Sequence, residues 1–149
     1  MAKKSRYKTN RRDPGAFVQI PLVVLSCAAY IRLSASAKAL LWDVVVQYKG
    51  DNNGRLLTGW SIMSEDRGWV SKDTLNRAKA ELLESGLLFE TRKGARPNKS
   101  SWCAATWWPL DWTPAMDIKE QDFPRGLYRQ NEALKIAPLS TESVQERAA

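Results

Sequence analysis

One stretch of the chain, residues 71–85, carries basic and amide side chains at spacings that gather them on one helical face. These side chains are Lys72, Asn76, Arg77 and Lys79. A DNA major groove is wide enough to admit a helix, and there asparagine can pair with adenine and arginine with guanine through two hydrogen bonds. The pattern therefore predicts a helix that contacts base edges. The alternative is an ordinary solvent-exposed face, because Asp73, Glu81 and Glu84 lie in the same stretch.

A second group of cations follows within eight residues that contain no acidic residue. Its members are Arg92, Lys93, Arg96 and Lys99. Like charges held this close repel one another unless a polyanion is bound beside them. We therefore expect these side chains to hold phosphate groups, which are contacts that position a protein on a nucleic acid without reading its sequence.

The charge of the whole chain favours the same class of partner. The 149 residues include 23 Lys and Arg against 16 Asp and Glu, which gives a formal net charge of +7, and such a balance favours polyanions. Residues 1–12 contain basic residues and no acidic one, and a turn signal, Asp-Pro-Gly, follows them. Residues 1–15 are therefore predicted to be a flexible basic arm, in which Arg11 and Arg12 contact phosphates or a minor groove.

The residue types needed for most other site chemistry are missing from the sequence. It has no histidine, no CxxC pair and no phosphate-binding glycine loop of the GxxxxGK type, and its two cysteines, Cys27 and Cys103, lie in apolar contexts typical of core positions. We expect no metal, no cofactor and no enzyme activity. An enzyme that uses carboxylates alone is the remaining alternative.

An apolar run at residues 21–31 follows the basic arm and imitates a secretory signal. Pro21 begins the run, Ser26 interrupts it and Arg32 ends it. The run is shorter than the roughly 20 residues of a membrane span. We therefore expect a cytoplasmic protein with no membrane partner.

Amphipathic helices are predicted to position the cations. Residues 34–48 form the first, capped by Ser34, and residues 60–67 a short second helix that stops at Gly68. Ser71 caps a third helix that ends at Gly86. The apolar faces of the first and third helices are Ala37, Leu40, Leu41, Val44, Val45 and Tyr48, and Leu75, Ala78, Leu82 and Leu83.

The strands are predicted around these helices. Residues 17–26 are predicted to form either a short strand leading into a helical turn or an irregular packed segment. Residues 55–58 are predicted to form a very short strand. Two strands, residues 87–92 and 101–112, flank the basic loop. Beyond Trp112 the chain is rich in proline and mixed charge, so residues 113–149 are predicted to be an extended or partly disordered tail.

The last predicted strand region is unusually rich in tryptophan. Its members are Trp102, Trp107, Trp108 and Trp112. Alternation along a strand would place indole rings on both faces of the sheet, although one face alone packs against the core. The other set is then covered by the tail or by another subunit, contacts a partner protein, or stacks on nucleic-acid bases.

The order of helix, short strand, two closely spaced helices and basic hairpin resembles the winged helix-turn-helix superfamily over residues 34–112. The stretch GWVSKDTLNRAKAELLESGLL is similar to a common pattern of that superfamily. The resemblance implies an α+β domain over residues 16–112, with three helices and a wing sheet of two to three strands. It also implies a recognition helix, residues 71–85, in the major groove and a wing, residues 93–100, on the adjacent backbone.

Residues 17–48 are similar to the opening of winged-helix domains in replication initiators of plasmids and phages, and in small helix-turn-helix proteins of mobile elements. The expected function is therefore binding of double-stranded DNA as a transcriptional regulator or replication accessory of a mobile element. The alternative is an interaction module or small subunit of a larger nucleoprotein complex, for defence or counter-defence, that uses the domain for protein or RNA contacts. A homodimer is compatible with both.

Overall fold

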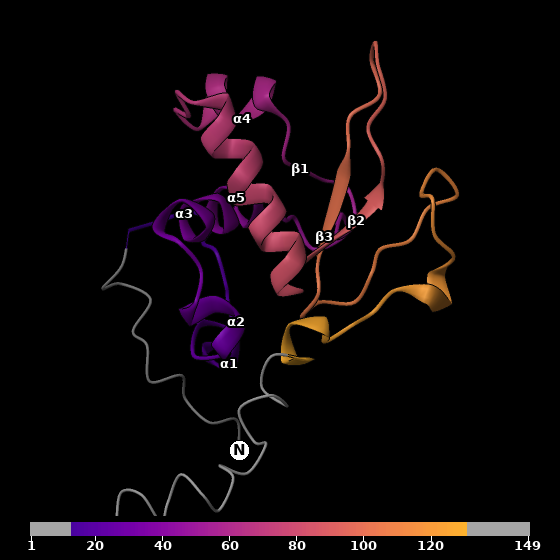
Figure 1. Cartoon of the computed structure of the whole chain (residues 1–149). Coiled ribbons are helices and arrows are strands. Elements are labelled where there is room, and N and C mark those ends of the chain that lie inside the picture. The colour runs from indigo at the N-terminus through magenta and orange to yellow at the C-terminus, as the bar shows by residue number, and fades with distance from the viewer. Residues whose placement is uncertain (1–12, 131–149) are drawn as a thin grey trace, which may run out of the picture.

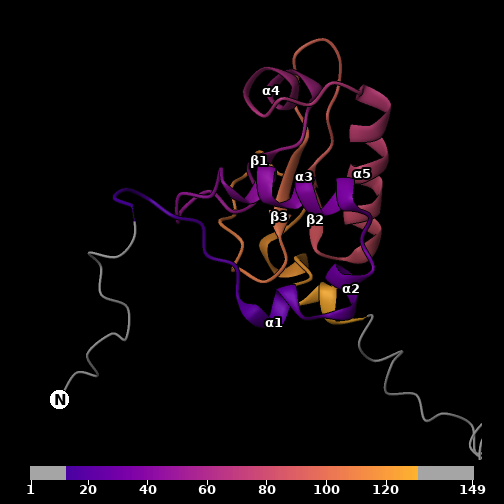
Figure 2. The same cartoon turned by 90° about the vertical axis from the view of Figure 1, so that its left-hand side faces the viewer.

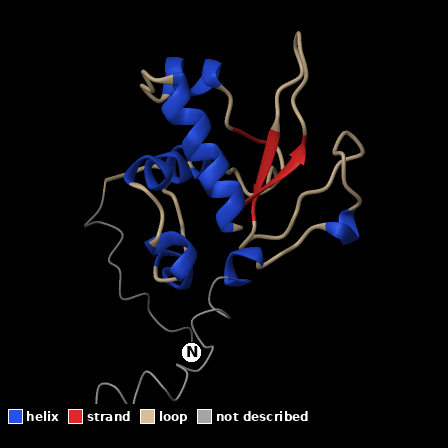
Figure 3. Cartoon of the chain, viewed as in Figure 1, coloured by secondary structure: helices blue, strands red, loops and turns tan. Residues whose placement is uncertain are grey.

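The computed structural model describes residues 13–130 of the chain. This part is a mixed α+β structure of short helices and one small antiparallel sheet (Figures 1 and 3), as the sequence predicted. The helices are α1 (Leu22–Leu25), α2 (Ala28–Ile31), α3 (Ala35–Val45), α4 (Trp60–Asp66) and α5 (Lys72–Ser85). The strands are β1 (Leu56–Leu57), β2 (Leu88–Arg92) and β3 (Trp102–Ala105), and two 3-10 helices, η2 (Glu120–Asp122) and η3 (Leu127–Arg129), follow. Among the described helices, none has both the length and the apolar character that spanning a membrane requires.

The helices α3 and α5 form the centre of the core, and serine caps begin both. The Ser34 hydroxyl accepts a hydrogen bond from the Ala37 amide, and the Ser71 hydroxyl accepts one from the Thr74 amide, each at 3.2 Å. The Ser34 hydroxyl also donates to the Glu81 carboxylate at 2.7 Å, which ties the start of α3 to α5. Helix α5 ends at Gly86, as predicted, whereas α3 ends at Val45, short of the predicted Tyr48.

The sheet has the strand order β1-β3-β2, with β3 antiparallel to both neighbours. Strand β3 stops at Ala105 rather than continuing to Trp112 as the sequence predicted. The chain leaves the sheet there because the Thr106 hydroxyl donates to the Gly86 carbonyl at 2.7 Å, and because the Thr106 carbonyl accepts from the Gly126 amide. The predicted alternation of tryptophans therefore does not extend past the strand.

The segment before the core, residues 17–26, contains no strand. It is irregular up to Pro21 and then enters α1, so it combines the irregular segment of one predicted alternative with the helical turn of the other. The Pro21 carbonyl accepts from the Val24 amide at 3.0 Å and so begins α1. Helices α1 and α2 lie beneath α3, at the end of the molecule opposite α4 (Figure 2).

Residues 113–130 run along β2 on the side of the sheet away from α3 (Figure 1). Apart from η2 and η3 this segment is irregular, but it is held at several points. The Asp117 amide donates to the Thr91 carbonyl at 2.8 Å, and the Phe123 ring meets Phe89 edge-on at 5.9 Å. Tyr128 is buried in the core. Covering β2 in this way protects an edge strand from pairing with another chain. Residues 131–149, the rest of the predicted tail, lie outside the described part.

Candidate nucleic-acid interface

The first turns of α5 and the tip of the β2–β3 hairpin point toward the same end of the molecule, the end that α4 also occupies (Figure 1). The hairpin is closed by reciprocal backbone hydrogen bonds between Ala95 and Lys99, at 2.8 and 2.9 Å. This pairing projects the loop beyond the rest of the sheet. The two cationic segments predicted from the sequence thus lie toward the same end of the molecule. We call their exposed polar side chains the α5–hairpin surface: Lys72, Asn76, Arg77, Lys93, Arg96 and Lys99.

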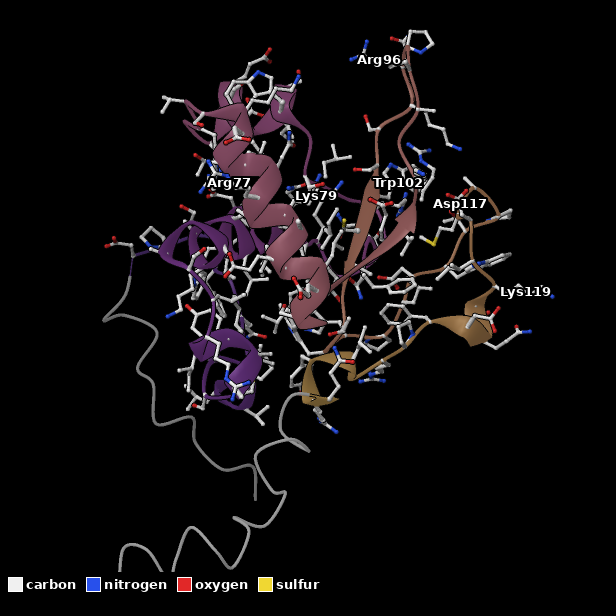
Figure 4. All side chains as sticks on the ribbon, in the orientation of Figure 1. Arg77, Lys79, Arg96, Trp102, Asp117 and Lys119 are labelled. Carbon is white, nitrogen blue, oxygen red and sulfur yellow. The ribbon has the colours of Figure 1, made fainter. Side chains whose placement is uncertain are left out.

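Several of these side chains have no partner in residues 13–130. Lys72 and Asn76 on α5, and Arg96 and Lys99 on the hairpin, are exposed, and no hydrogen bond or ion pair within the described chain engages their side chains. Figure 4 shows Arg96 at the very tip of the hairpin. Unpaired cations on a projecting loop are suited to contact an external anion.

Arg77 differs from these, because its guanidinium pairs with Asp73 one turn earlier on α5. Both side chains are 77% exposed, so solvent screens the pair and it contributes little to stability. Arg77 can therefore exchange Asp73 for another acceptor, although the carboxylate makes the first turns of α5 less positive than the hairpin.

The structure places Lys79 half-buried between α5 and the base of the hairpin. Its ammonium donates to the Ser101 hydroxyl at 2.9 Å and pairs with the Glu90 carboxylate at 3.2 Å. Lys79 therefore joins α5 to both strands at the base of the hairpin, and it orients the hairpin relative to the helix. Its predicted role as a nucleic-acid contact competes with these two bonds.

Arg92 is also engaged within the protein. Its guanidinium carbon lies 3.5 Å from the centre of the Trp102 ring, and its Nε and Nη2 atoms donate to the Ser100 carbonyl at 3.1 and 2.8 Å. This stack braces the two strands where the hairpin leaves the sheet, and it occupies one face of Trp102. The side chain of the next residue, Lys93, has no partner in the described part of the chain, and its amide donates to the Asp117 carboxylate at 2.7 Å.

The turn between α4 and α5 is fixed to α3 by one carboxylate. Asp43 accepts from Arg67 Nε at 2.9 Å and from the Trp69 indole at 2.8 Å. These bonds fix the start of α5 to α3, so Asp43 positions the α5–hairpin surface without being part of it. The residues that sequence reasoning missed are of this positioning kind: Asp43, Glu90, Ser101 and Asp117.

The four tryptophans of the predicted strand do not form one aromatic platform. Trp107 is buried, and Trp108 stacks on Tyr48 with ring centres 3.8 Å apart. The Trp112 indole donates to the Ile118 carbonyl at 2.8 Å, within the segment that follows β3. Packing by the following chain, one of the alternatives, therefore accounts for Trp112, and Trp102 is covered on one face by Arg92.

The predicted phosphate contacts Arg11 and Arg12 lie outside the described residues.

Both cysteines are buried and free, at 1% exposure or less. Burial raises the pKa of the Cys103 thiol to about 11, an effect that the nearby Lys79 partly opposes. No group of three or more potential metal ligands among His, Cys, Asp and Glu occurs in residues 13–130.

Cys103→Ala is expected to weaken the alkaline pH dependence of stability. Because the folded-state pKa lies above the ordinary value of 9.0, the stabilisation from keeping the thiol protonated is fully present below pH 9 and is lost as pH rises through 11. Urea unfolding across this range should show that the wild type loses more stability than the variant, by up to about 1.4 kcal/mol per pH unit. Parallel pH profiles for the two proteins would contradict this expectation.

No protein-family model, curated protein or solved structure matches the chain.

Proposed function

We propose that this chain is a winged-helix protein that binds double-stranded DNA through the α5–hairpin surface. The observation that carries the proposal is that α5 and the β2–β3 loop reach the same end of the molecule and that both carry polar side chains without a partner in residues 13–130, Lys72 and Asn76 on α5 and Arg96 and Lys99 on the loop. The element order α3, β1, α4, α5, β2, β3 and the three-stranded antiparallel sheet support the proposal, because they agree with the order of elements on which the sequence resemblance rests.

The side chains divide into two roles under this proposal. Lys72, Asn76 and Arg77 contact base edges from the first two turns of α5, where the helix also presents free backbone N–H groups. Lys93, Arg96 and Lys99 contact phosphates from the hairpin, and no acidic residue lies between residues 91 and 101. Lys79 holds α5 against the base of the hairpin, and Arg92 braces the two strands of the hairpin against each other.

The biological role that we propose, a transcriptional regulator or replication accessory of a mobile element in the cytoplasm, rests on the sequence resemblance alone. A second candidate is an interaction module within a larger nucleoprotein assembly. One observation favours it: Leu22 and Val23 on α1 are 79% and 54% exposed, at the end of the molecule away from the hairpin. An exposed apolar pair of this kind suits a protein contact better than a phosphate.

The test is a selection from a pool of random duplexes, with single-stranded DNA and duplex RNA of matched length as competitors. Enrichment of a common duplex motif is the expected result. If single-stranded DNA, duplex RNA and duplex DNA displaced the bound duplexes equally well, electrostatic attraction alone would explain the binding. If no duplex were retained at low salt, the proposal would be overturned. Retention of RNA alone would favour the second candidate.

A further inference from the structure

The outward face of α3 is apolar, although no described element covers it. Its members are Ala35, Ala39, Trp42 and Val46, where Val46 is the residue that ends the helix. All four are exposed, and Trp42 and Val46 remain 38% and 40% accessible. Their spacing of four, three and four residues is the spacing of a helix–helix seam.

A hollow lies beside each half of this face. One, of about 360 Å³, is lined by Ala39 and by Trp69 and Val70 from the turn before α5, and Val70 is 93% exposed. The other, of about 500 Å³, is lined by Val46 and by the stacked rings of Tyr48 and Trp108. The partly exposed Trp42 indole lies on the face between these two recesses, whose linings combine apolar side chains with polar ones such as Gln19 and Thr74.

We propose that this face is the interface of a homodimer in which two α3 helices pack antiparallel about a two-fold axis. The face has a small end, Ala35 and Ala39, and a large end, Trp42 and Val46. Antiparallel packing sets the small end of one copy against the large end of the other, so that Ala39 faces Trp42 and Ala35 faces Val46. Parallel packing would set indole against indole and leave a gap between the alanines.

The charges that flank the face do not oppose its burial. The Lys38 ammonium lies over the Tyr30 ring, 5.4 Å from its centre, and Asp43 is bound by Arg67 and Trp69. Both charges therefore keep their own partners when a second copy covers the face, which avoids the cost of burying an unpaired charge.

The hollows are needed to make the interface large enough. Helix α3 has 11 residues and is about 16 Å long, which is short for the roughly 800 Å² that each partner contributes to a stable interface. Insertion of each Trp42 into the recess beside Ala39 of the other copy extends the contact to the residues around Val70. Self-complementarity of this kind is what a two-fold interface requires.

The orientation of α3 also agrees with the proposed function. In Figure 2, α3 crosses the front of the molecule horizontally, while the start of α5 and the hairpin tip point upward. A vertical two-fold axis makes the two α3 helices antiparallel and leaves both α5–hairpin surfaces at the same end. The dimer would then meet two half-sites on one duplex, an expectation that rests on the proposed function, whereas the dimer itself does not.

Sedimentation of the purified full chain without DNA, over a dilution series, tests the interface. The wild type is expected to sediment as a dimer that dissociates on dilution, and Trp42→Glu with Val46→Glu as a monomer. Leu22→Glu, a matched change at an exposed apolar residue outside the face, should remain dimeric. Circular dichroism confirms that each variant is folded. A wild-type monomer at every concentration, or a folded double variant that still dimerises, would overturn the proposal.

Disulfide formation tests the antiparallel arrangement. Ala35→Cys and Val46→Cys chains, mixed and oxidised, are expected to cross-link to each other and not to themselves, because identical positions lie about 16 Å apart along antiparallel helices. The native cysteines are buried and should not compete. Cross-links within each single variant would show parallel packing and contradict the proposed geometry. Neither experiment contains DNA, so a failure to bind DNA leaves both results interpretable.

Discussion

Asn53→Ala is expected to lower the free energy of unfolding by about 3–5 kcal/mol, the largest effect on stability that we predict for a polar residue. The Asn53 side chain is fully buried and is held by hydrogen bonds at both ends. Its Oδ1 accepts from the Ala105 amide at 2.8 Å, and its Nδ2 donates to the carbonyls of Ala105 and Pro109 at 3.0 and 2.9 Å. Alanine would leave these buried backbone groups unpaired.

The reason for so large an effect lies in the sheet. Strand β1 has two residues and pairs with Trp102 and Cys103, so Ala105 at the end of β3 lies beyond its reach. Asn53 takes the place of the missing strand residue by exchanging two hydrogen bonds with Ala105. The Asn53 backbone also exchanges hydrogen bonds with Asp111, at 2.8 and 2.9 Å, and so holds the chain that leaves the sheet.

Urea unfolding of the full chain measures the change. Asn98→Ala, at an exposed position in the hairpin loop, is the matched control and should alter stability by less than about 0.5 kcal/mol. Asn52→Ala is an intermediate case, because within residues 13–130 its half-buried side chain bonds the Lys49 amide and the Gln47 carbonyl alone. A loss below about 1 kcal/mol for Asn53→Ala would show that water replaces the lost hydrogen bonds.

The contrast between Asn53 and Ser71 shows which parts of the fold were predictable from sequence. A helix cap acts over three residues, and an apolar face repeats within two turns, so Ser34, Ser71 and the buried faces of α3 and α5 are visible as local patterns. Asn53 and Asp111 are 58 residues apart, and their sequence context, a turn of Asp, Asn and Gly, predicts only the turn. Side chains that bond across the fold have no local periodicity to reveal them.

The same distinction applies to the candidate interface. Composition and helical spacing predicted a cationic loop and a helix with polar side chains, and the structure brings these two elements to one end of the molecule. The sequence patterns could not distinguish the cations that have partners, Lys79 and Arg92, from those that have none within the described residues. The latter are Lys72, Arg96 and Lys99. That difference depends on Glu90 and Trp102 reaching the base of the hairpin from neighbouring strands.

Gly86 illustrates why the path of residues 113–130 was not foreseen. The sequence marked it as a helix end, which its φ of +80° explains. The structure adds a second constraint, because a Cβ at this position would lie 2.8 Å from the Leu127 carbonyl. The returning segment thus packs against the end of α5 where there is no side chain, a contact between residues 41 positions apart that no local pattern encodes.

Replacing Arg96 and Lys99 with glutamate is expected to lower affinity for every duplex by at least about tenfold, and to reduce the slope of log K against log salt by about 2. The slope should fall because each lost phosphate contact removes about 0.9. Both side chains are exposed and make no bond in the described chain, so their replacement should leave the fold intact. Arg32→Glu with Lys49→Glu makes the same change in net charge on exposed residues outside the α5–hairpin surface, and it controls for long-range attraction.

Arg77→Ala completes the comparison, because α5 and the hairpin are proposed to act differently. Its loss should cost about 1–3 kcal/mol on the preferred duplex and little on others, which relaxes sequence preference. Titrations with a selected duplex and a scrambled one, each at several salt concentrations, separate the two effects. If the control pair weakened binding as much as the hairpin pair, net charge rather than the hairpin would account for affinity. If Arg77→Ala weakened both duplexes equally, α5 would contact the backbone and the bases would be read elsewhere.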